Sequence, residues 1–260
     1  AIGVWGRDII EGRAVTESVS CLQLDVGNSS AKWRLVRGGQ VIDRGYYRPD
    51  DADSQALLLG CAEQLDSIWV ASVAAAAAED ALTALLMKKW NVAPWYARTE
   101  ARTGTLCNSY AEPGRMGVDR WLAMLGARNL EQGRLCVVDA GSALTIDIVA
   151  SSGQHEGGYI VPGPALMERA LLLDTDRVRF EENVGYALAP GKSTAEAVRH
   201  GIALAQAGAV TLALDQAGAE PLTLFFCGGA GETLMRLIPR VGHWVPDLVF
   251  DGLGVMASLR

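Results

Sequence analysis

The sequence predicts an α/β protein built from two similar domains that face a common cleft. An apolar strand pattern ends in D-x-G at residues 21–27, and the same pattern returns at residues 135–141. In each half, two more strand patterns and helical periodicity follow. Because this order repeats without a short-period repeat, we interpret the duplication as one of architecture. We therefore expect domains at 21–133 and 134–260, preceded by a poorly patterned N-terminal extension at 1–20.

The first half opens with three strand patterns, C-L-Q-L-D-V-G, A-K-W-R-L-V-R and Q-V-I-D-R-G-Y-Y, separated by G-N-S-S and G-G. Their apolar and polar alternation predicts a three-stranded meander. Further patterns predict a helix at 54–65, a strand at 68–73 and a helix at 79–90. A loop rich in Thr, Gly, Asn and Pro at 98–115 then precedes an amphipathic helix at 117–132.

The second half repeats the meander as L-C-V-V-D-A-G, A-L-T-I-D-I-V-A and G-G-Y-I-V. Helices are predicted at 165–173 and 194–216, followed by the strand L-T-L-F-F-C. A G-G-A-G turn then begins at Gly228, and helices follow up to Ile238 and near Leu253. Such a glycine turn lets a flat ring such as adenine lie close to the backbone, although glycine turns are common.

The composition argues against several classes of protein. Half of the residues are hydrophobic and a fifth are charged, which is typical of a packed globular chain. The net charge of -7, without a Lys/Arg run, predicts no large nucleic-acid surface. The five cysteines are scattered and contain no C-x-x-C pair, so we expect a reducing cytoplasm without disulfides or zinc. We expect no membrane helix, and we assign no chemistry to the three dispersed histidines.

The first candidate site is the turn Asp25-Val26-Gly27-Asn28-Ser29-Ser30, with Lys32 on the strand that follows. Gly27 allows close approach of a ligand, the polar side chains can donate to phosphate oxygens, and Lys32 supplies positive charge. Asp25 is suited to a water-bound divalent cation. An ordinary hairpin turn is the alternative, because these are common turn residues.

The second candidate site repeats this arrangement at Asp139-Ala140-Gly141-Ser142-Ala143-Leu144-Thr145-Ile146-Asp147. Two matching D-x-G turns that each end an apolar strand are what a nucleotide cleft between duplicated domains requires. A third candidate is Gly117-Val118-Asp119-Arg120, where a loop enters a helix. Here Asp119 can accept a proton from a substrate hydroxyl, and Arg120 can pair with an anionic group. An N-capping Asp beside an exposed Arg is the alternative.

Five segments resemble, in the same order, those of the type III pantothenate kinases, which belong to the acetate and sugar kinase/Hsp70/actin superfamily. They read L-D-V-G-N-S-S-A-K, N-S-Y-A-E-P-G-R-M-G-V-D-R-W, D-A-G-S-A-L-T-I-D, G-G-Y-I-V-P-G-P-A-L-M and K-S-T-A-E-A-V-R-H-G. The resemblance implies two duplicated ribonuclease H-like (actin-like ATPase) domains, with mixed sheets flanked by helices and an ATP cleft between them. Ser142 stands where the family usually has Thr, and Ala140 replaces a bulkier apolar residue.

The resemblance also implies roles for individual residues. The ATP phosphates would be surrounded by Asp25, Val26, Gly27, Asn28, Ser29, Ser30, Ala31 and Lys32, with Ser142 on the opposite side. Asp139 would bind a monovalent cation. The pantothenate pocket would contain Tyr110, Gly117, Val118, Asp119 and Arg120. In that pocket Asp119 would be the general base and Arg120 would hold the pantothenate carboxylate. Thr194 would come from the partner subunit of a homodimer.

The implied reaction transfers the γ-phosphoryl group of ATP to the primary hydroxyl of pantothenate, which is the first step of coenzyme A synthesis. Mg²⁺ and a K⁺ or NH₄⁺ ion would offset the phosphate charge. Two alternatives come from other classes: an accessory factor for transcription, and a different phosphotransferase or filament subunit of the superfamily. The retained Asp25, Asp119, Arg120 and Asp139 argue against the first, and the loop around Asp119 argues against the second.

Overall fold

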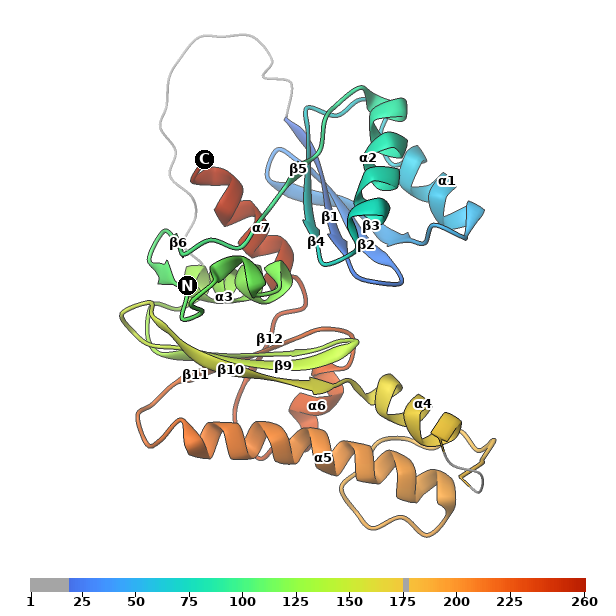
Figure 1. The fold of residues 1–260 in the computed structure, drawn as a ribbon, viewed down its shortest axis with the longest axis vertical. Coiled ribbons are helices and arrows are strands. Elements are labelled where there is room, and N and C mark those ends of the chain that lie inside the picture. The colour runs from blue at the N-terminus through green and yellow to red at the C-terminus, as the bar shows by residue number, and fades with distance from the viewer. Residues whose placement is uncertain (1–18, 175–177) are drawn as a thin grey trace.

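The computed structural model describes residues 19–174 and 178–260. Two five-stranded mixed sheets have the same strand order, β3-β2-β1-β4-β5 and β10-β9-β8-β11-β12 (Figure 1). In each, an antiparallel meander is extended by two parallel strands. The strands of the first sheet are β1 (Ser20–Val26), β2 (Ala31–Arg37), β3 (Gln40–Tyr47), β4 (Ser67–Ser72) and β5 (Trp95–Tyr96). Those of the second are β8 (Leu135–Ala140), β9 (Ala143–Val149), β10 (His155–Pro162), β11 (Thr223–Cys227) and β12 (His243–Trp244).

Helices cover both faces of each sheet (Figure 1). The outer face of the first sheet packs against α1 (Ala52–Gly60) and α2 (Ala76–Trp90), and that of the second against α5 (Thr194–Gln216) and α6 (Gly231–Leu237). Between the sheets lie α3 (Val118–Leu130) and α7 (Leu248–Ser258). The remaining elements are the short hairpin of β6 (Arg102–Thr103) and β7 (Leu106–Cys107), a 3₁₀ turn (Pro113–Arg115) and α4 (Pro164–Asp174).

The two inner helices cross closely because each has a glycine at the crossing point. A Cβ on Gly126 of α3 would overlap the carbonyl oxygen of Leu248, and one on Gly252 of α7 would overlap that of Leu122. The small residues allow the backbones to approach, so α3 and α7 form one apolar layer that both sheets share.

This shared layer crosses the predicted domain boundary, because each of its two helices packs on the sheet of the other half. The strands of the first sheet end at Tyr96 and those of the second begin at Leu135, but the helices do not divide with the sheets. Helix α7 returns from the second half to pack on β1 and β4, and α3 packs on β8 and β9 of the second sheet. Apolar residues on several sides of both helices explain why they are buried between the sheets. The predicted extension at 1–20 lies outside the described residues up to position 18, and β1 begins at Ser20.

The predicted elements agree closely with the observed ones, and α5 has the predicted bounds of 194–216. Ser193 caps this helix, because its hydroxyl accepts the amide hydrogen of Glu196. By length and composition α5 is also long and apolar enough to cross a membrane, whereas we expected no such helix. In the structure it packs through Ala207, Val210 and Leu214 on the outer face of the second sheet.

Candidate active site

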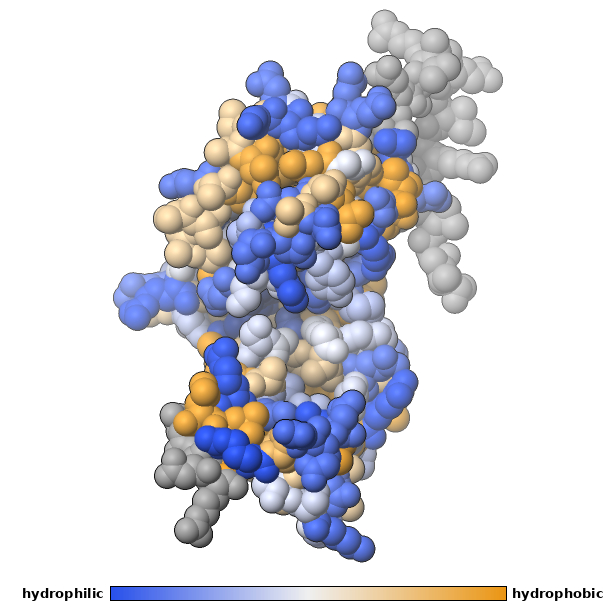
Figure 2. Space-filling model, turned by 90° about the vertical axis from the view of Figure 1, so that its right-hand side faces the viewer, coloured by the Kyte–Doolittle hydropathy of each residue, from blue (hydrophilic) through white to orange (hydrophobic). Residues whose placement is uncertain are grey.

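The two D-x-G turns face each other across a cavity of about 270 Å³ between the two halves. Figure 2 shows that the molecule is narrower between its two halves than within either half. Asp25, Asn28 and Lys32 line the cavity from the first sheet, and Asp139 and Ser142 line it from the second. The cavity is further lined by Gly27, Ser30, Asp119, Gly141, Thr145, Cys227, Gly228 and Phe250. The predicted nucleotide turns and the predicted base therefore share one site.

Strand alternation brings the charged groups to the inner face of each sheet. Asp25 pairs in register with Lys32, and Asp139 pairs with Thr145. Since side chains alternate along a strand, Val26 and Ala31 instead point into the core behind the first sheet. Only their backbone groups can face a phosphate, which corrects the expectation for these two residues. Ser29 is exposed and does not line the cavity.

Each turn is closed by a backbone hydrogen bond. The amide of Gly27 donates to the carbonyl oxygen of Ser30 at 2.9 Å, and that of Gly141 donates to Ala143 at 2.9 Å. The second turn is held from behind by Gly163, whose amide donates to the carbonyl oxygen of Ser142 at 3.0 Å. A Cβ on Gly163 would overlap Ser142 and Gly141, so glycine is required where the chain leaves β10.

Negative charge dominates the cavity. Burial, followed by the charges of Asp139 and Asp119, raises the pKa of Asp25 to about 7. Burial and then the charge of Asp119 raise the pKa of Asp139 to about 6. Among the described residues that line the cavity, Lys32 is the one cation. Three carboxylates beside one ammonium group form a site suited to added cations.

The carboxylates can act as separate cation ligands. Within residues 19–174 and 178–260, no three His, Cys, Asp or Glu side chains converge on one point. Oxygen donors are the ligands that Mg²⁺ and other hard cations prefer, and Mg²⁺ is commonly held by one or two carboxylates together with substrate phosphates. Asp25 and Asp139 fit this chemistry as single ligands on opposite sides of the cavity.

Asp119 enters the cavity from the first turn of α3. Its Oδ1 accepts the backbone N–H of Arg120 at 2.8 Å, which anchors the carboxylate beside the helix N-terminus. Gly117 is the N-cap residue, and a Cβ there would overlap Oδ1 of Asp119. The N-cap alternative is therefore wrong for Asp119. Burial raises the pKa of Asp119, which favours a group that accepts and releases protons.

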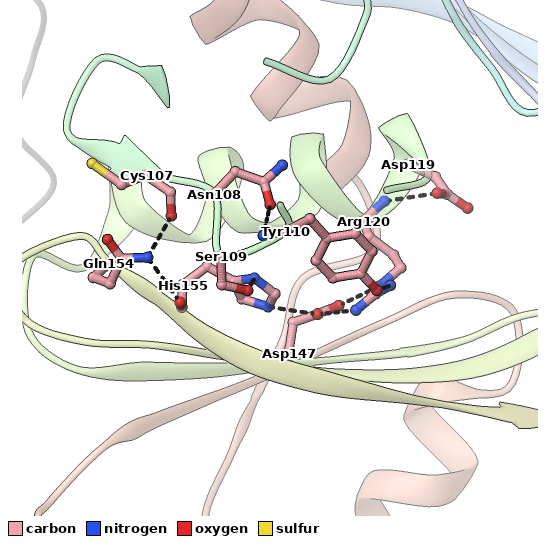
Figure 3. A network of polar contacts seen from close by, with 9 residues as sticks. All are labelled: Cys107, Asn108, Ser109, Tyr110, Asp119, Arg120, Asp147, Gln154 and His155. Carbon is pink, nitrogen blue, oxygen red and sulfur yellow. Dashed lines mark hydrogen bonds and ion pairs between the residues drawn. The ribbon is translucent and has the colours of Figure 1, made fainter. Parts of the chain in front are cut away.

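Arg120 is buried, contrary to the alternative of an exposed side chain. Its Nε donates to Oδ2 of Asp147 at 2.9 Å, and its Nη2 donates to Oδ1 of the same carboxylate. Its Nη1 donates to the Tyr110 hydroxyl at 2.9 Å (Figure 3). Tyr110 and Arg120 thus lie together, although neither lines the cavity between the two turns. Val118 is buried beside them in the core, so its side chain packs rather than lines the cavity.

Sequence reasoning gave no role to Asp147, the last residue of the second candidate site, or to His155; both are buried and in contact at 3.0 Å. We gave His155 no chemistry because the histidines are dispersed along the chain. One signal was present: Asp147 interrupts the apolar strand A-L-T-I-D-I-V-A, and a carboxylate at a buried strand position requires a partner. Thr194 does not line the cavity but lies at an apolar groove between α4 and α5.

The G-G-A-G turn after β11 adjoins the cavity through Gly228 and Gly229. Gly228 has a φ of +81°, and a Cβ there would overlap Oδ1 of Asp139. Glycine therefore lets the turn pass directly beside this carboxylate. A second, mostly apolar cavity of about 220 Å³ begins at Gly229 and extends between α5 and α6, where Ala230 and Leu234 line it.

The paired sheets, with an acidic cleft between two matching turns, define the class as an actin-like ATPase-fold phosphotransferase. The family model described as "Type III pantothenate kinase" matches residues 21–216. Type III pantothenate kinases from Hahella chejuensis and Ectopseudomonas mendocina are 36% and 37% identical to the chain. The alignments cover 91% and 92% of this chain and 97% and 99% of those proteins. The chain belongs to the type III pantothenate kinase family.

Solved structures agree on the fold. A protein from Campylobacter jejuni, described as a Baf family transcriptional activator, is similar with a TM-score of 0.58 and 22% identity. A protein from Sinorhizobium meliloti, described as a 2-dehydro-3-deoxygalactonokinase, gives a TM-score of 0.59 and 15% identity. The alignments cover 91% of this chain in both cases, and 97% and 95% of those chains. At these identities the likeness extends to the fold alone.

Proposed function

We propose that the protein transfers the γ-phosphoryl group of ATP to the primary hydroxyl of pantothenate, the first step of coenzyme A synthesis. One observation carries this proposal: the carboxylate of Asp119 lies in the same cavity as both D-x-G turns. A base beside two phosphate-binding turns is what phosphoryl transfer to an alcohol requires.

The residues that line the cavity would have different roles in this reaction. Asp119 accepts the proton of the attacking hydroxyl, and its raised pKa suits that task. Asn28, Ser30 and Ser142 donate hydrogen bonds to phosphate oxygens from the two sides, and Lys32 supplies positive charge. Mg²⁺ bound with the nucleotide would neutralise part of the phosphate charge beside Asp25, and a K⁺ or NH₄⁺ ion would do so beside Asp139. The adenine ring would use the apolar cavity next to Gly229.

Arg120 and Tyr110 would hold the carboxylate of pantothenate. Asp147 and Tyr110 take three of the five N–H donors of Arg120, which leaves two for a ligand. Paired with Asp147, the guanidinium is fixed in one orientation, so it can bind a carboxylate without first ordering its own side chain.

A homodimer with the active site at its interface is part of the proposal. Thr194 lies with Leu166 and Val198 at an apolar groove of about 720 Å³ between α4 and α5. Leu166 and Leu173 are exposed on the same half, where Figure 2 shows an apolar patch. A patch of this kind is typical of a protein interface. We expect Leu166→Glu to lower the molar mass measured by light scattering, whereas Leu57→Glu, at an exposed leucine of α1, leaves it unchanged.

The direct test is a coupled assay for ADP formed with pantothenate, comparing the parent with Asp119→Asn. We expect turnover to fall by about 10²-fold or more, because a general base is lost. ATP binding, measured by calorimetry, should be retained. A parent protein without pantothenate-dependent turnover under any monovalent cation would exclude the proposed function. Equal rates in the two proteins would remove Asp119 from its role.

The role of an accessory factor for transcription is not favoured. A protein that only binds a partner has no need for three mutually repelling carboxylates in one cavity, because they destabilise the fold in the absence of cations. The free state of all five cysteines is compatible with the reducing cytoplasm in which we propose that the enzyme works.

A further inference from the structure

A ring of hydrogen bonds ties the loop before α3 to the β9–β10 hairpin (Figure 3). Ser109 Oγ lies 2.8 Å from Nδ1 of His155, and Nε2 of His155 lies 3.0 Å from Oδ1 of Asp147. The Asp147 carboxylate accepts a hydrogen bond from Nε of Arg120, and Nη1 of Arg120 donates to the Tyr110 hydroxyl. Because Ser109 and Tyr110 are adjacent in the chain, the contacts close on the same loop.

The direction of each hydrogen bond follows from the chemistry of Asp147. Its carboxylate faces the Arg120 guanidinium and can only accept, so Nε2 of His155 must carry the proton that lies between them. With the proton on Nε2, Nδ1 is free to accept the hydroxyl hydrogen of Ser109. His155 thus connects an exposed loop residue to a buried ion pair.

The backbone of β10 leaves room for this ring. A register shift between His155 and Gly157 bends the strand where the imidazole turns inward. A Cβ on Gly158 would overlap Oδ1 of Asp147 and Nη2 of Arg120. The loop is also held along its backbone, since the amide of Cys107 donates to the carbonyl oxygen of Gly153 at 2.9 Å.

We infer that His155 and Asp147 are positioning residues for the acceptor substrate: together they fix Arg120 and the loop at Tyr110 in the orientation that receives a carboxylate-bearing alcohol. This inference rests on the proposed function, because it concerns the acceptor side of that reaction. Arg120, Tyr110, His155 and Asp147 all lie outside the lining of the cavity. His155 and Asp147 contact the proposed acceptor residues through the hydrogen bonds of the ring.

The residue types Ser109, His155 and Asp147 are also those of a serine hydrolase triad, but the charges here differ. In a hydrolase the carboxylate stabilises the imidazolium that forms when the serine is deprotonated. In this protein Arg120 already occupies the Asp147 carboxylate. The carboxylate that stabilises an imidazolium in a hydrolase is therefore already paired with a guanidinium here. The ring therefore orients Ser109 rather than activating it.

Two substitutions at His155 separate the two contacts. His155→Gln retains an amide near the position of Nε2 and hence the contact with Asp147, whereas His155→Asn retains one near Nδ1 and the contact with Ser109. Ser109→Ala removes the loop contact from the other side, and because Ser109 is exposed this variant should fold normally.

We expect His155→Asn to raise the KM for pantothenate by about tenfold, the effect of one lost buried hydrogen bond, while the KM for ATP stays within about twofold. Ser109→Ala and His155→Gln should give equal, smaller increases, and the double variant should add nothing further. This pattern would distinguish a positioning role from a general loss of stability, because a general loss of stability would raise the KM for ATP as well as that for pantothenate.

Three results would overturn the inference. They are an unchanged KM for pantothenate in both His155→Asn and Ser109→Ala, equal losses for ATP and pantothenate, and covalent labelling of Ser109 by a fluorophosphonate probe. A parent enzyme that turns over pantothenate, together with any of these, would leave the proposed function in place. A parent without that turnover would overturn both.

Discussion

The inner faces of the two duplicated sheets carry equivalent buried charges of opposite sign. Arg34 pairs in register with Gln23, two residues before Asp25, and Asp147 pairs with Val137, two residues before Asp139. Arg34 reaches Asp251 of α7 at 3.2 Å, and Asp147 reaches Arg120 of α3. The same position in each repeat therefore holds one of the two crossing helices through an ion pair.

The two pairs differ in their access to water. The Arg34 and Asp251 side chains are 10% and 37% exposed, whereas those of Arg120 and Asp147 are 4% and 2% exposed. Water can replace a lost partner at the first pair but not at the second, where the remaining charge would stay buried. The second pair is therefore the more tightly constrained of the two, and it lies on the side of the proposed acceptor pocket.

Breaking each pair with the same substitution tests this difference most directly. Asp147→Asn keeps the shape of the side chain but leaves Arg120 without a counter-charge, so we expect a loss of about 3–5 kcal/mol in the free energy of unfolding. The matched variant Asp251→Asn should cost about 1 kcal/mol or less. Urea unfolding measures both. Similar losses in the two variants would show that burial does not distinguish the pairs.

The glycines of the two halves give a second contrast. Gly228→Ala would force a Cβ against Asp139 at a φ of +81°, and we expect it to destabilise the protein by about 1–3 kcal/mol. In Gly27→Ala the nearest atom to the new Cβ is the Ser30 carbonyl oxygen at 3.4 Å, an ordinary contact. This variant should change the free energy of unfolding by about 0.5 kcal/mol or less. Melting temperatures of the two variants would test this order. A lower melting temperature for Gly27→Ala than for Gly228→Ala would contradict the prediction.

The two acidic turns give an effect of the opposite sign, because removing a charge there should stabilise the protein. The pKa of Asp25 is about 7 in the folded protein against an ordinary 3.8, so the folded state holds this proton more tightly than the unfolded chain. Stability from this group is therefore largest at low pH and is lost as the pH rises from about 4 to 7.

Asparagine at position 25 cannot ionise, so Asp25→Asn should stabilise the ligand-free protein at pH 8 by up to about 4 kcal/mol and have little effect near pH 4. Asp139→Asn should do the same to a smaller extent, because the pKa of Asp139 is raised only to about 6. Melting temperatures at the two pH values would check both, and a destabilised Asp25→Asn variant at pH 8 would contradict the prediction.

Much of the architecture follows from local pattern. The two meanders, the D-x-G turns between their first two strands and the bounds of α5 could be predicted because period-2 alternation, turn residues and helix caps act over short distances. The return of α7 to the first sheet could not, because it depends on the match between Gly252 and Gly126, which lie far apart in the chain. The same holds for the ring through His155, whose members come from three separate segments.

By itself, the sequence predicted Asp25, Asp139 and Asp119 as groups of a phosphoryl-transfer site, because each stands at a turn or a helix start within a motif that resembles those of the family. Only the tertiary structure decided that Arg120 is a buried partner of Asp147 and that His155 connects this pair to Ser109. The physical reason is that a buried charge is tolerated only beside its partner, and a partner is a matter of distance in space rather than of position in the chain.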